Sequence, residues 1–316
     1  MKKKTIKFLL KAAVSAVFLF YIIFKVKWVE VLFYASEIKL WQIILYMTVY
    51  LLGILISSYK WKILCDYKNI KHKLLDYFRF YLAGAFINNF MPSFIGGDTF
   101  RAYQIGKQDE KYIEAGSTVL MDRITGFVGA AILSIIFGVI NFKNVIHSKM
   151  LIIINMLVIF SLFSDLLIIR FARSSYFQKI KKYIPEKILE LAREVRNYNN
   201  DTKILYKAVF WSAVFNFIGV AMANYVLFLS LGIKVGLLNY LSAVFLISII
   251  SALPISINNI GIKEWAYITF FGAFGVSTSA VITVAILSRF LQMIISFAAL
   301  PTYLKEKKEK NQPVIG

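Results

Sequence analysis

Seven charged residues stand in stretches of this sequence that are otherwise apolar. They are Asp98, Arg101, Asp122, Arg123, Lys263, Glu264 and Arg289. A charge at the centre of a membrane span costs at least about 2.5–3.5 kcal/mol on insertion scales, so such residues normally face a protein interior or an aqueous cavity. There a carboxylate and a cation pair with each other, or an arginine holds a phosphate through two parallel N–H donors. The residue types therefore predict ion pairing and anion binding inside a membrane.

These charges follow a pattern that occurs twice. In each copy an apolar segment is interrupted by Pro, Gly and Asn, and an arginine follows about one helix later. The first copy spans residues 88–101 and is followed by Arg123, and the second spans residues 253–264 and is followed by Arg289. A duplicated, interrupted hydrophobic segment is typical of transporters whose binding site lies near the bilayer midplane.

We assign the residues of the two copies to two roles. The expected substrate contacts are Arg101, Arg123, Arg289, Lys263, Gly96, Gly97, Asn89 and Asn259. The expected ion-pair or coupling residues are Asp98, Asp122 and Glu264. Arg123 is expected to reach Asp98, Arg289 to reach Glu264, and backbone N–H groups at the broken helix starts to face an anion. Two alternatives stay open. In the first, the ion pairs bind no substrate and only hold the broken segments in place. In the second, Asn88, Asn89, Asn258 and Asn259 only cap backbone groups that the helix breaks leave without partners.

The elements that position these residues are predicted to be membrane helices. The chain is 59% hydrophobic, and several apolar runs exceed 18 residues, which is enough to span a bilayer as a helix. We predict an all-α, polytopic membrane protein with about six full spans and two re-entrant helical hairpins in an inverted repeat. The full spans are expected at about 6–26, 40–60, 117–141, 150–170, 205–231 and 278–301.

The distribution of Lys and Arg sets the expected orientation in the cell membrane. If the interrupted segments dip in and return to the same side, both termini and the basic segment 171–204 are cytoplasmic. Pro92 and Pro254 then lie near the tips of hairpins that enter from opposite faces. The alternative is that the interrupted segments cross as kinked helices. Within 171–204, Pro185 marks the start of an expected amphipathic surface helix.

A single transmembrane domain is expected over residues 1–304. Its two repeats are expected at about 77–141 and 238–301, and residues 305–316 form an expected cytoplasmic tail.

Other function classes are disfavoured by the composition. The net charge of +20 is explained by basic loops between spans, so nucleic acid is not an expected partner. Cys65 is the single cysteine, and His72 and His147 are far apart in sequence, so no disulfide and no metal site is expected. With two histidines and neither a nucleophile motif nor a nucleotide-binding loop, we expect no cofactor and no enzymatic reaction.

The motif residues resemble those of a known family. They are Asn88, Pro92, Gly96, Gly97, Asp98, Arg101, Asp122, Arg123, Pro254, Asn259, Gly261, Glu264 and Arg289. Over nearly the whole chain the sequence resembles the lysylphosphatidylglycerol synthase transmembrane region family, also called flippase-like or UPF0104 membrane proteins. In its larger members, the multiple peptide resistance factors, this module flips a lysyl-lipid made by a C-terminal synthase domain. The resemblance implies a stand-alone member without that domain, a type associated with lipid-linked glycan translocation.

The leading hypothesis is a flippase or scramblase for an anionic or phosphate-bearing lipid, which crosses through a midplane cavity lined by arginines. The lipid is expected to be an anionic phospholipid, such as an aminoacyl-phospholipid, or a polyprenyl-phosphate-linked lipid, and transport to be facilitated or ion-coupled. A homo-oligomer is left open. Two other classes compete with this hypothesis: a membrane-embedded lipid-modifying enzyme of the phosphatidylglycerol lysyltransferase type, and an accessory subunit that presents lipid to a partner.

Overall fold

The computed structural model describes residues 2–90, 95–172, 184–253 and 255–304, and the regular structure in these ranges is helical throughout. Within them, four helices are long and apolar enough to cross a membrane: Leu40–Tyr67, Tyr112–Ile140, Thr202–Ser230 and Thr278–Leu304. Shorter apolar helices cover Ala13–Lys25, Lys149–Ser161 and Leu237–Ala252. The predicted all-α, polytopic membrane fold is therefore confirmed.

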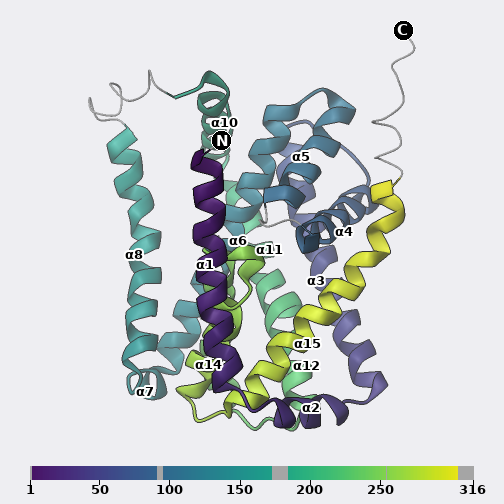
Figure 1. Ribbon diagram of the computed structural model, residues 1–316. Coiled ribbons are helices and arrows are strands. Elements are labelled where there is room, and N and C mark those ends of the chain that lie inside the picture. Colours follow the sequence, from purple (N-terminus) through teal and green to yellow (C-terminus); the bar gives the residue numbers. More distant parts are fainter. Residues whose placement is uncertain (1, 91–94, 173–183, 254, 305–316) are drawn as a thin grey trace.

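The helices pack side by side as a bundle, and short connections join most of them (Figure 1). The first half contains α1 (Lys2–Lys25), α2 (Trp28–Ser36), α3 (Leu40–Tyr67), α4 (Leu74–Phe90), α5 (Ile95–Asp109), α6 (Tyr112–Ile140), α7 (Phe142–Val145) and α8 (Lys149–Ala172). The second half contains α10 (Glu186–Asn197), α11 (Thr202–Phe215), α12 (Ala223–Ser230), α13 (Leu237–Ala252), α14 (Ile262–Gly272) and α15 (Thr278–Ser296). A π-helical segment, Asn216–Met222, joins α11 to α12, and short 3₁₀ turns lie at Tyr198–Asn200, Ile257–Asn259 and Phe297–Ala299.

Each interrupted segment forms two helices that pack on each other and on the long helix that follows. In the first copy α4 packs on α5 and α5 on α6; in the second α13 packs on α14 and α14 on α15. In Figure 1, α4 and α5 lie in the upper half of the view and α14 lies in the lower half. Pro92 and Pro254, the predicted hairpin tips, fall outside the described residues.

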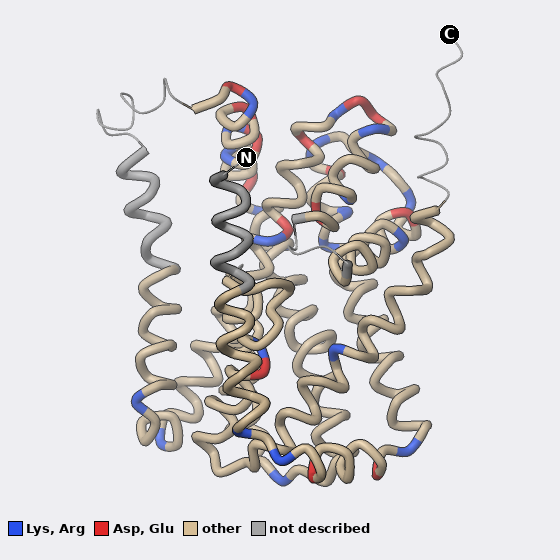
Figure 2. Tube along the Cα trace, viewed as in Figure 1, with Lys and Arg blue, Asp and Glu red and all other residues tan. Residues whose placement is uncertain are grey.

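The two ends of the bundle differ in charge. The start of α1, the helix α10 and the end of the last described helix, Thr278–Leu304, lie at the upper end in Figure 1, while α2 and α7 lie at the lower end. Figure 2 shows that most charged residues gather toward the two ends, more densely at the upper one, and that a few lie within the bundle. The latter are the subject of the next section.

Local sequence explains how the last helices are held. At the start of α15 the Ser277 hydroxyl accepts the backbone N–H of Ala280 at 3.2 Å, which satisfies one donor of the first turn. Fully buried aromatic rings then join α12, α13 and α14: the ring centroid of Phe228 lies 4.7 Å from that of Phe271 and 5.0 Å from that of Tyr240. This core fixes α13 and α14 against the rest of the bundle.

The amphipathic helix expected after Pro185 is present as α10. It packs on α6, and Leu191 lies against Gly116 of that helix. Lys68, at the end of α3, bonds Glu194 of α10 at 2.7 Å. The part of the basic segment that lies at 173–183 is outside the described residues.

Three features differ from the expected elements. The helix α2 was not predicted; it lies across the end of the bundle (Figure 1). Its Val29 is 82% exposed, whereas its Val31 is buried. The fifth span contains the π-helical segment, at which Gly219 meets Gly53 of α3 backbone to backbone. The last span was expected to end at Pro301, but helical backbone continues to Leu304, because a 3₁₀ turn at Phe297–Ala299 places this proline at a new helix start.

Candidate functional site

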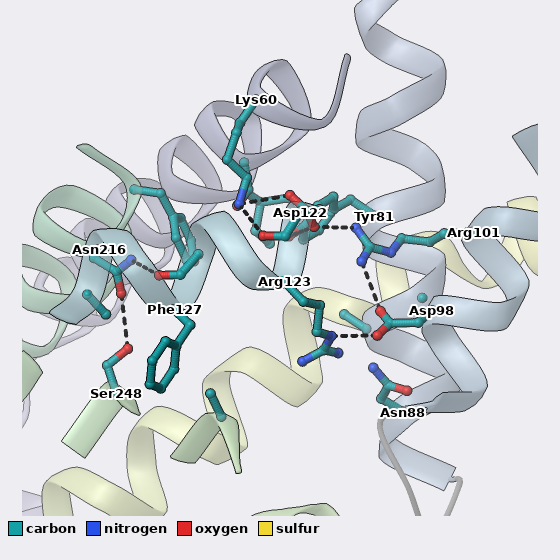
Figure 3. A pocket seen from close by; sticks show the side chains of 18 of the residues that line it. Lys60, Tyr81, Asn88, Asp98, Arg101, Asp122, Arg123, Phe127, Asn216 and Ser248 are labelled. Atoms are coloured by element: carbon teal, nitrogen blue, oxygen red, sulfur yellow. Dashed lines mark hydrogen bonds and ion pairs between the residues drawn. The ribbon is translucent and has the colours of Figure 1, made fainter. Parts of the chain in front are cut away.

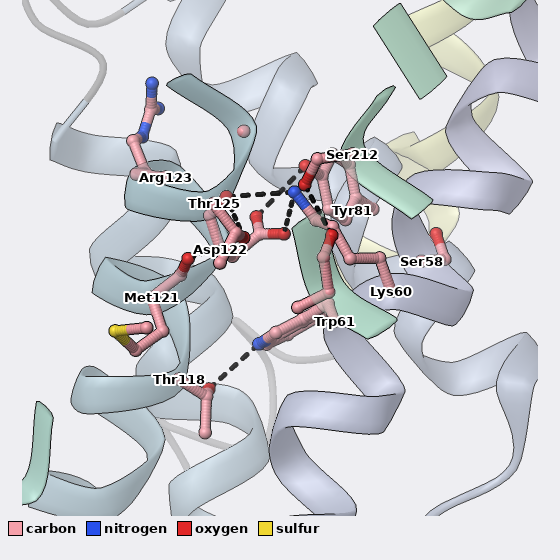
Figure 4. Close-up of polar contacts among 12 residues, drawn as sticks. Ser58, Lys60, Trp61, Tyr81, Thr118, Met121, Asp122, Arg123, Thr125 and Ser212 are labelled. Atoms are coloured by element: carbon pink, nitrogen blue, oxygen red, sulfur yellow. Dashed lines mark hydrogen bonds and ion pairs between the residues drawn. The ribbon is translucent and has the colours of Figure 1, made fainter. Parts of the chain in front are cut away.

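A buried carboxylate, Asp122 of α6, is the centre of the first charged cluster. Lys60 Nζ of α3 lies 2.8 Å from Asp122 Oδ1 and also donates to the backbone carbonyl of Asp122 at 2.9 Å. Arg101 Nη1 and the Tyr81 hydroxyl both donate to Asp122 Oδ2, at 3.2 and 3.1 Å. The side chains of Lys60 and Asp122 are only 2% and 3% exposed (Figure 4). A charge so deeply buried is tolerated because each cation faces a carboxylate at hydrogen-bond distance.

Asp98 of α5 connects this buried pair to the cavity. Its Oδ1 accepts from Arg101 Nη2 at 2.9 Å, and its Oδ2 accepts from Arg123 Nε at 2.5 Å (Figure 3). The Arg101 guanidinium also lies over the rings of Trp61 and Tyr81, 4.9 and 4.2 Å from their centroids. Arg101 is thus locked in place by two carboxylates and two aromatic faces, whereas the Arg123 side chain is 40% exposed.

The second charged cluster is built around Glu264 and Arg289. Arg289 Nη2 lies 2.9 Å from Glu264 Oε1, which is the partner expected from the sequence. The same guanidinium donates to the backbone carbonyls of Asn258 and Asn259 at 3.0 and 3.2 Å. These two asparagines have φ values of 46° and 55°, an unfavourable left-handed backbone that the arginine helps to hold.

Lys263 is the cation of this cluster that has no carboxylate. Its Nζ donates to Ser288 Oγ at 3.1 Å, and within the described ranges no carboxylate oxygen lies at ion-pair distance from it. The residue lines a cavity beside Arg289. Lys263 is therefore available to an anion.

One ion pair has the same spacing in the two clusters. Asp98 and Arg123 are 25 residues apart, and so are Glu264 and Arg289. By the same spacing, Ser288 takes the position that Asp122 has in the first copy. The second copy therefore has a serine in place of the buried acid of the first, and Lys263 donates to its hydroxyl.

Both clusters open into adjoining cavities. The first cavity, about 280 Å³, is lined by Lys60, Asp98, Arg101, Asp122 and Arg123 among others. The second, about 360 Å³, is lined by Lys263 and Arg289 together with several carboxamide side chains. The two cavities share the lining residues Tyr50, Ala85, Asn88, Phe215, Ser248 and Ala252. Residues from both halves of the chain thus line two adjoining cavities.

The backbone N–H groups that were expected to face an anion have partners within the protein. The Gly97 N–H donates to Asn88 Oδ1 at 2.8 Å, and the Gly261 N–H donates to Glu264 Oε2 at 2.7 Å. Gly97 has a packing role instead, because a Cβ there would lie 2.1 Å from the carbonyl oxygen of Gly84 in α4. Gly96 lies in the first turn of α5. Asn88 therefore has the capping role that was left open for the asparagines, because its side-chain oxygen accepts an N–H of the first turn of α5.

Comparison with known proteins adds a family. The family described as the lysylphosphatidylglycerol synthase transmembrane region matches residues 8–299. The chain belongs to this family. It is 28% identical over 281 residues to the UPF0104 membrane protein MJ1595 of Methanocaldococcus jannaschii, covering 81% of each chain. It is also 26% identical over 232 residues to the UPF0104 membrane protein MJ1078 of the same organism, covering 72% of this chain and 97% of the relative. No solved structure matches the chain.

This member of the lysylphosphatidylglycerol synthase transmembrane-region family is a multi-pass integral membrane protein. Its cavity contains one functional candidate that sequence analysis missed, Lys60. This lysine stands at the end of the predicted second span, where a basic residue resembles a flank set by the positive-inside rule. In the structure α3 continues to Tyr67, so Lys60 lies well inside the helix. The length of that apolar helix was the signal that could have found it.

Proposed function

We propose that this protein moves an anionic or phosphate-bearing lipid, of the aminoacyl-phospholipid or lipid-linked glycan class, between the two leaflets of the cell membrane. One observation carries the proposal: each of two adjoining cavities is lined by a cluster with one more cation than carboxylate. The first cluster has Lys60, Arg101 and Arg123 against Asp98 and Asp122. The second has Lys263 and Arg289 against Glu264.

A surplus of positive charge at these positions suits a phosphate that leaves water. Such a headgroup must exchange its hydration for comparable donors, and the side chains of Arg123 and Lys263 line the cavities where it would pass. Arg101 and Arg289 have a different part, because carboxylates and backbone carbonyls already occupy most of their donors. They hold the broken segments in the positions that shape the cavities.

The proposal includes an inverted repeat of two re-entrant hairpins. It is supported by the equal 25-residue spacing of the two ion pairs and by the placement of α4–α5 and α14 toward opposite ends of the bundle (Figure 1). Hairpins that enter from opposite faces give a headgroup access to the adjoining cavities from either leaflet.

Translocation by the purified protein is the decisive experiment. Liposomes that contain the protein and a fluorescent phosphatidylglycerol are treated with a membrane-impermeant quencher, and we expect the fraction quenched to rise well above the half found in protein-free vesicles. Arg193→Ala is the matched control, because this exposed arginine lies on α10, away from both cavities. Chemical turnover of the lipid would instead support the enzyme alternative. If the protein neither moves the lipid nor converts it chemically, the proposal is contradicted and the accessory subunit is favoured.

A further inference from the structure

Three carboxamide side chains that line the second cavity are held by their nitrogen atoms and leave oxygen atoms without a partner among the described residues. They belong to Asn89 of α4, Asn259 of the segment before α14, and Gln292 of α15. Asn259 is 6% exposed, and its Oδ1 has no hydrogen-bond partner among the described residues. Asn89 Oδ1 and Gln292 Oε1 likewise take part in no hydrogen bond within the described part of the chain.

The nitrogen of each amide has a partner that fixes its orientation. Asn89 Nδ2 donates to Ser296 Oγ at 2.7 Å, and this hydroxyl accepts because its own proton goes to the carbonyl of Met293 at 2.7 Å. Asn259 Nδ2 donates to the carbonyl of Ser251, which has no proton to give. A flipped amide would set two acceptors against each other at both positions.

The same reasoning applies to Gln292. Its Nε2 donates to the Tyr46 hydroxyl at 2.9 Å, and the proton of that hydroxyl goes to the carbonyl of Ser288 at 3.3 Å. The Tyr46 oxygen therefore accepts from the amide nitrogen. Together, these three residues, which line one cavity, leave three acceptor oxygens without a hydrogen-bond donor among the described residues.

These acceptors lie in a cavity whose charge is positive. Lys263 and Arg289 line it, and the carboxylate of Glu264 is already bound by Arg289 and by the Gly261 N–H. Phosphate oxygens satisfy the cations but only accept, so they leave the amide oxygens without donors. An ammonium group would donate, but it would face a surplus of positive charge. Hydroxyl groups donate without carrying charge.

We propose that the second cavity selects a lipid headgroup that carries both a phosphate and hydroxyl groups, such as phosphoglycerol or a sugar phosphate, over a headgroup that carries an amine. The phosphate lies against Lys263, and the hydroxyls donate to the oxygens of Asn89, Asn259 and Gln292. This inference rests on the proposed function for its lipid, and it narrows the two lipid classes to the one whose headgroup carries hydroxyl groups and no amine.

Equilibrium binding to the purified full-length protein in detergent tests the inference without requiring transport. A fluorescent phosphatidylglycerol is displaced by competitors with identical acyl chains: phosphatidylglycerol, phosphatidylmethanol and lysyl-phosphatidylglycerol. Phosphatidylmethanol is the matched probe, because it has the same charge and no hydroxyl. We expect phosphatidylglycerol to compete at about tenfold lower concentration than phosphatidylmethanol, as one or two additional hydrogen bonds would give. Lysyl-phosphatidylglycerol is expected to compete more weakly than phosphatidylglycerol.

The variant Gln292→Leu removes one acceptor, and we expect the ratio between the first two competitors to fall toward one. Arg193→Ala serves as the control and keeps the wild-type ratio. Equal competition by phosphatidylglycerol and phosphatidylmethanol would overturn the inference, and so would stronger competition by the lysyl-lipid. Both comparisons use the wild-type protein, so they decide the question even if Gln292→Leu does not fold. Glycerol phosphate without acyl chains is the last competitor; if it matched the lipid, the ligand would be water-soluble and the inference would be wrong. Selective binding without transport would contradict only the proposed function.

Discussion

Arg123 and Arg289 occupy equivalent positions, yet their surroundings differ. Arg123 shares Asp98 with Arg101 and has a partly exposed side chain, whereas Arg289 bonds a buried carboxylate and two backbone carbonyls. A residue that is held in place on all sides serves structure first. The two arginines, for which the sequence predicted the same role, therefore separate into a cavity-facing residue and a positioning residue.

For Arg123→Ala we expect loss of lipid translocation in a protein that stays folded. Asp98 keeps Arg101 as its partner at 2.9 Å, so removal of Arg123 leaves no isolated buried charge, and stability is expected to change by about 1 kcal/mol or less. Arg123→Lys is expected to restore activity only in part, because an ammonium lacks the planar fork of the guanidinium. The measurements are liposome translocation and thermal unfolding in detergent. Full activity of a stable Arg123→Ala protein would discard this role.

For Arg289→Met we expect a loss of stability as well as activity. The change leaves Glu264 buried without its cation, which costs about 3–5 kcal/mol. Glu264→Gln in the same chain is expected to recover part of the loss, because the amide oxygen can still accept from the Gly261 N–H. Thermal unfolding of the single and double variants measures the effect. An unfolding temperature equal to the wild type for Arg289→Met would show that the residue is not a structural support.

The buried pair of Lys60 and Asp122 gives the sharpest test of stability. Asp122→Leu removes the acid shared by Lys60 and Arg101, and we expect a loss of about 3–5 kcal/mol, since Lys60 is then a buried charge without a counter-ion. Adding Lys60→Met is expected to restore much of the loss, because Arg101 still pairs with Asp98. Additive losses in the double variant would contradict this coupling.

At the scale of elements, α3 and the π-helical segment cross closely beside the second cavity, which Gly219 lines. A Cβ at Gly53 would lie 2.3 Å from the Cα of Gly219, which is backbone and cannot move aside cheaply. We expect Gly53→Ala to cost about 1–3 kcal/mol through overpacking. Gly272→Ala is the matched control, because no atom lies within 4 Å of its added Cβ. Equal unfolding temperatures for the two variants would mean that the crossing is not tight in solution.

The elements that sequence predicts well here are those with a strong local signal. Long apolar runs located the four described helices that are long enough to cross a membrane, and Pro185 with an apolar stripe located α10. Features that depend on contacts between distant segments gave no such signal. The approach of Gly53 to Gly219 and the burial of Lys60 against Asp122 arise only when α3 meets its neighbours. The two ion pairs at 25-residue spacing could be predicted from the sequence, because each joins two charged residues that have few other possible partners in the surrounding apolar sequence.

At the scale of the whole molecule, the structure places several helix ends at one end of the bundle. The start of α1, the helix α10 and the end of the last described helix share this end, and α2 lies at the other (Figure 1). Because Lys and Arg are retained on the cytoplasmic side, the end that holds the lysine-rich start of α1 is expected to face the cytoplasm, and α10 lies at this same end. Because the start of α1 and the end of the last described helix lie at the same end of the bundle, the chain between them is expected to cross the membrane an even number of times.

Cysteine labelling in intact cells tests this orientation. In a Cys65→Ser background we expect Arg193→Cys on α10 to react with a membrane-impermeant maleimide only after permeabilisation, and Glu37→Cys, just after α2, to react in intact cells. Both positions are exposed, so a lack of reaction reports the side of the membrane rather than burial. The two variants control for each other. Reversed labelling would invert the orientation, and labelling of both positions in intact cells would contradict the placement of α2 and α10 at opposite ends of the bundle.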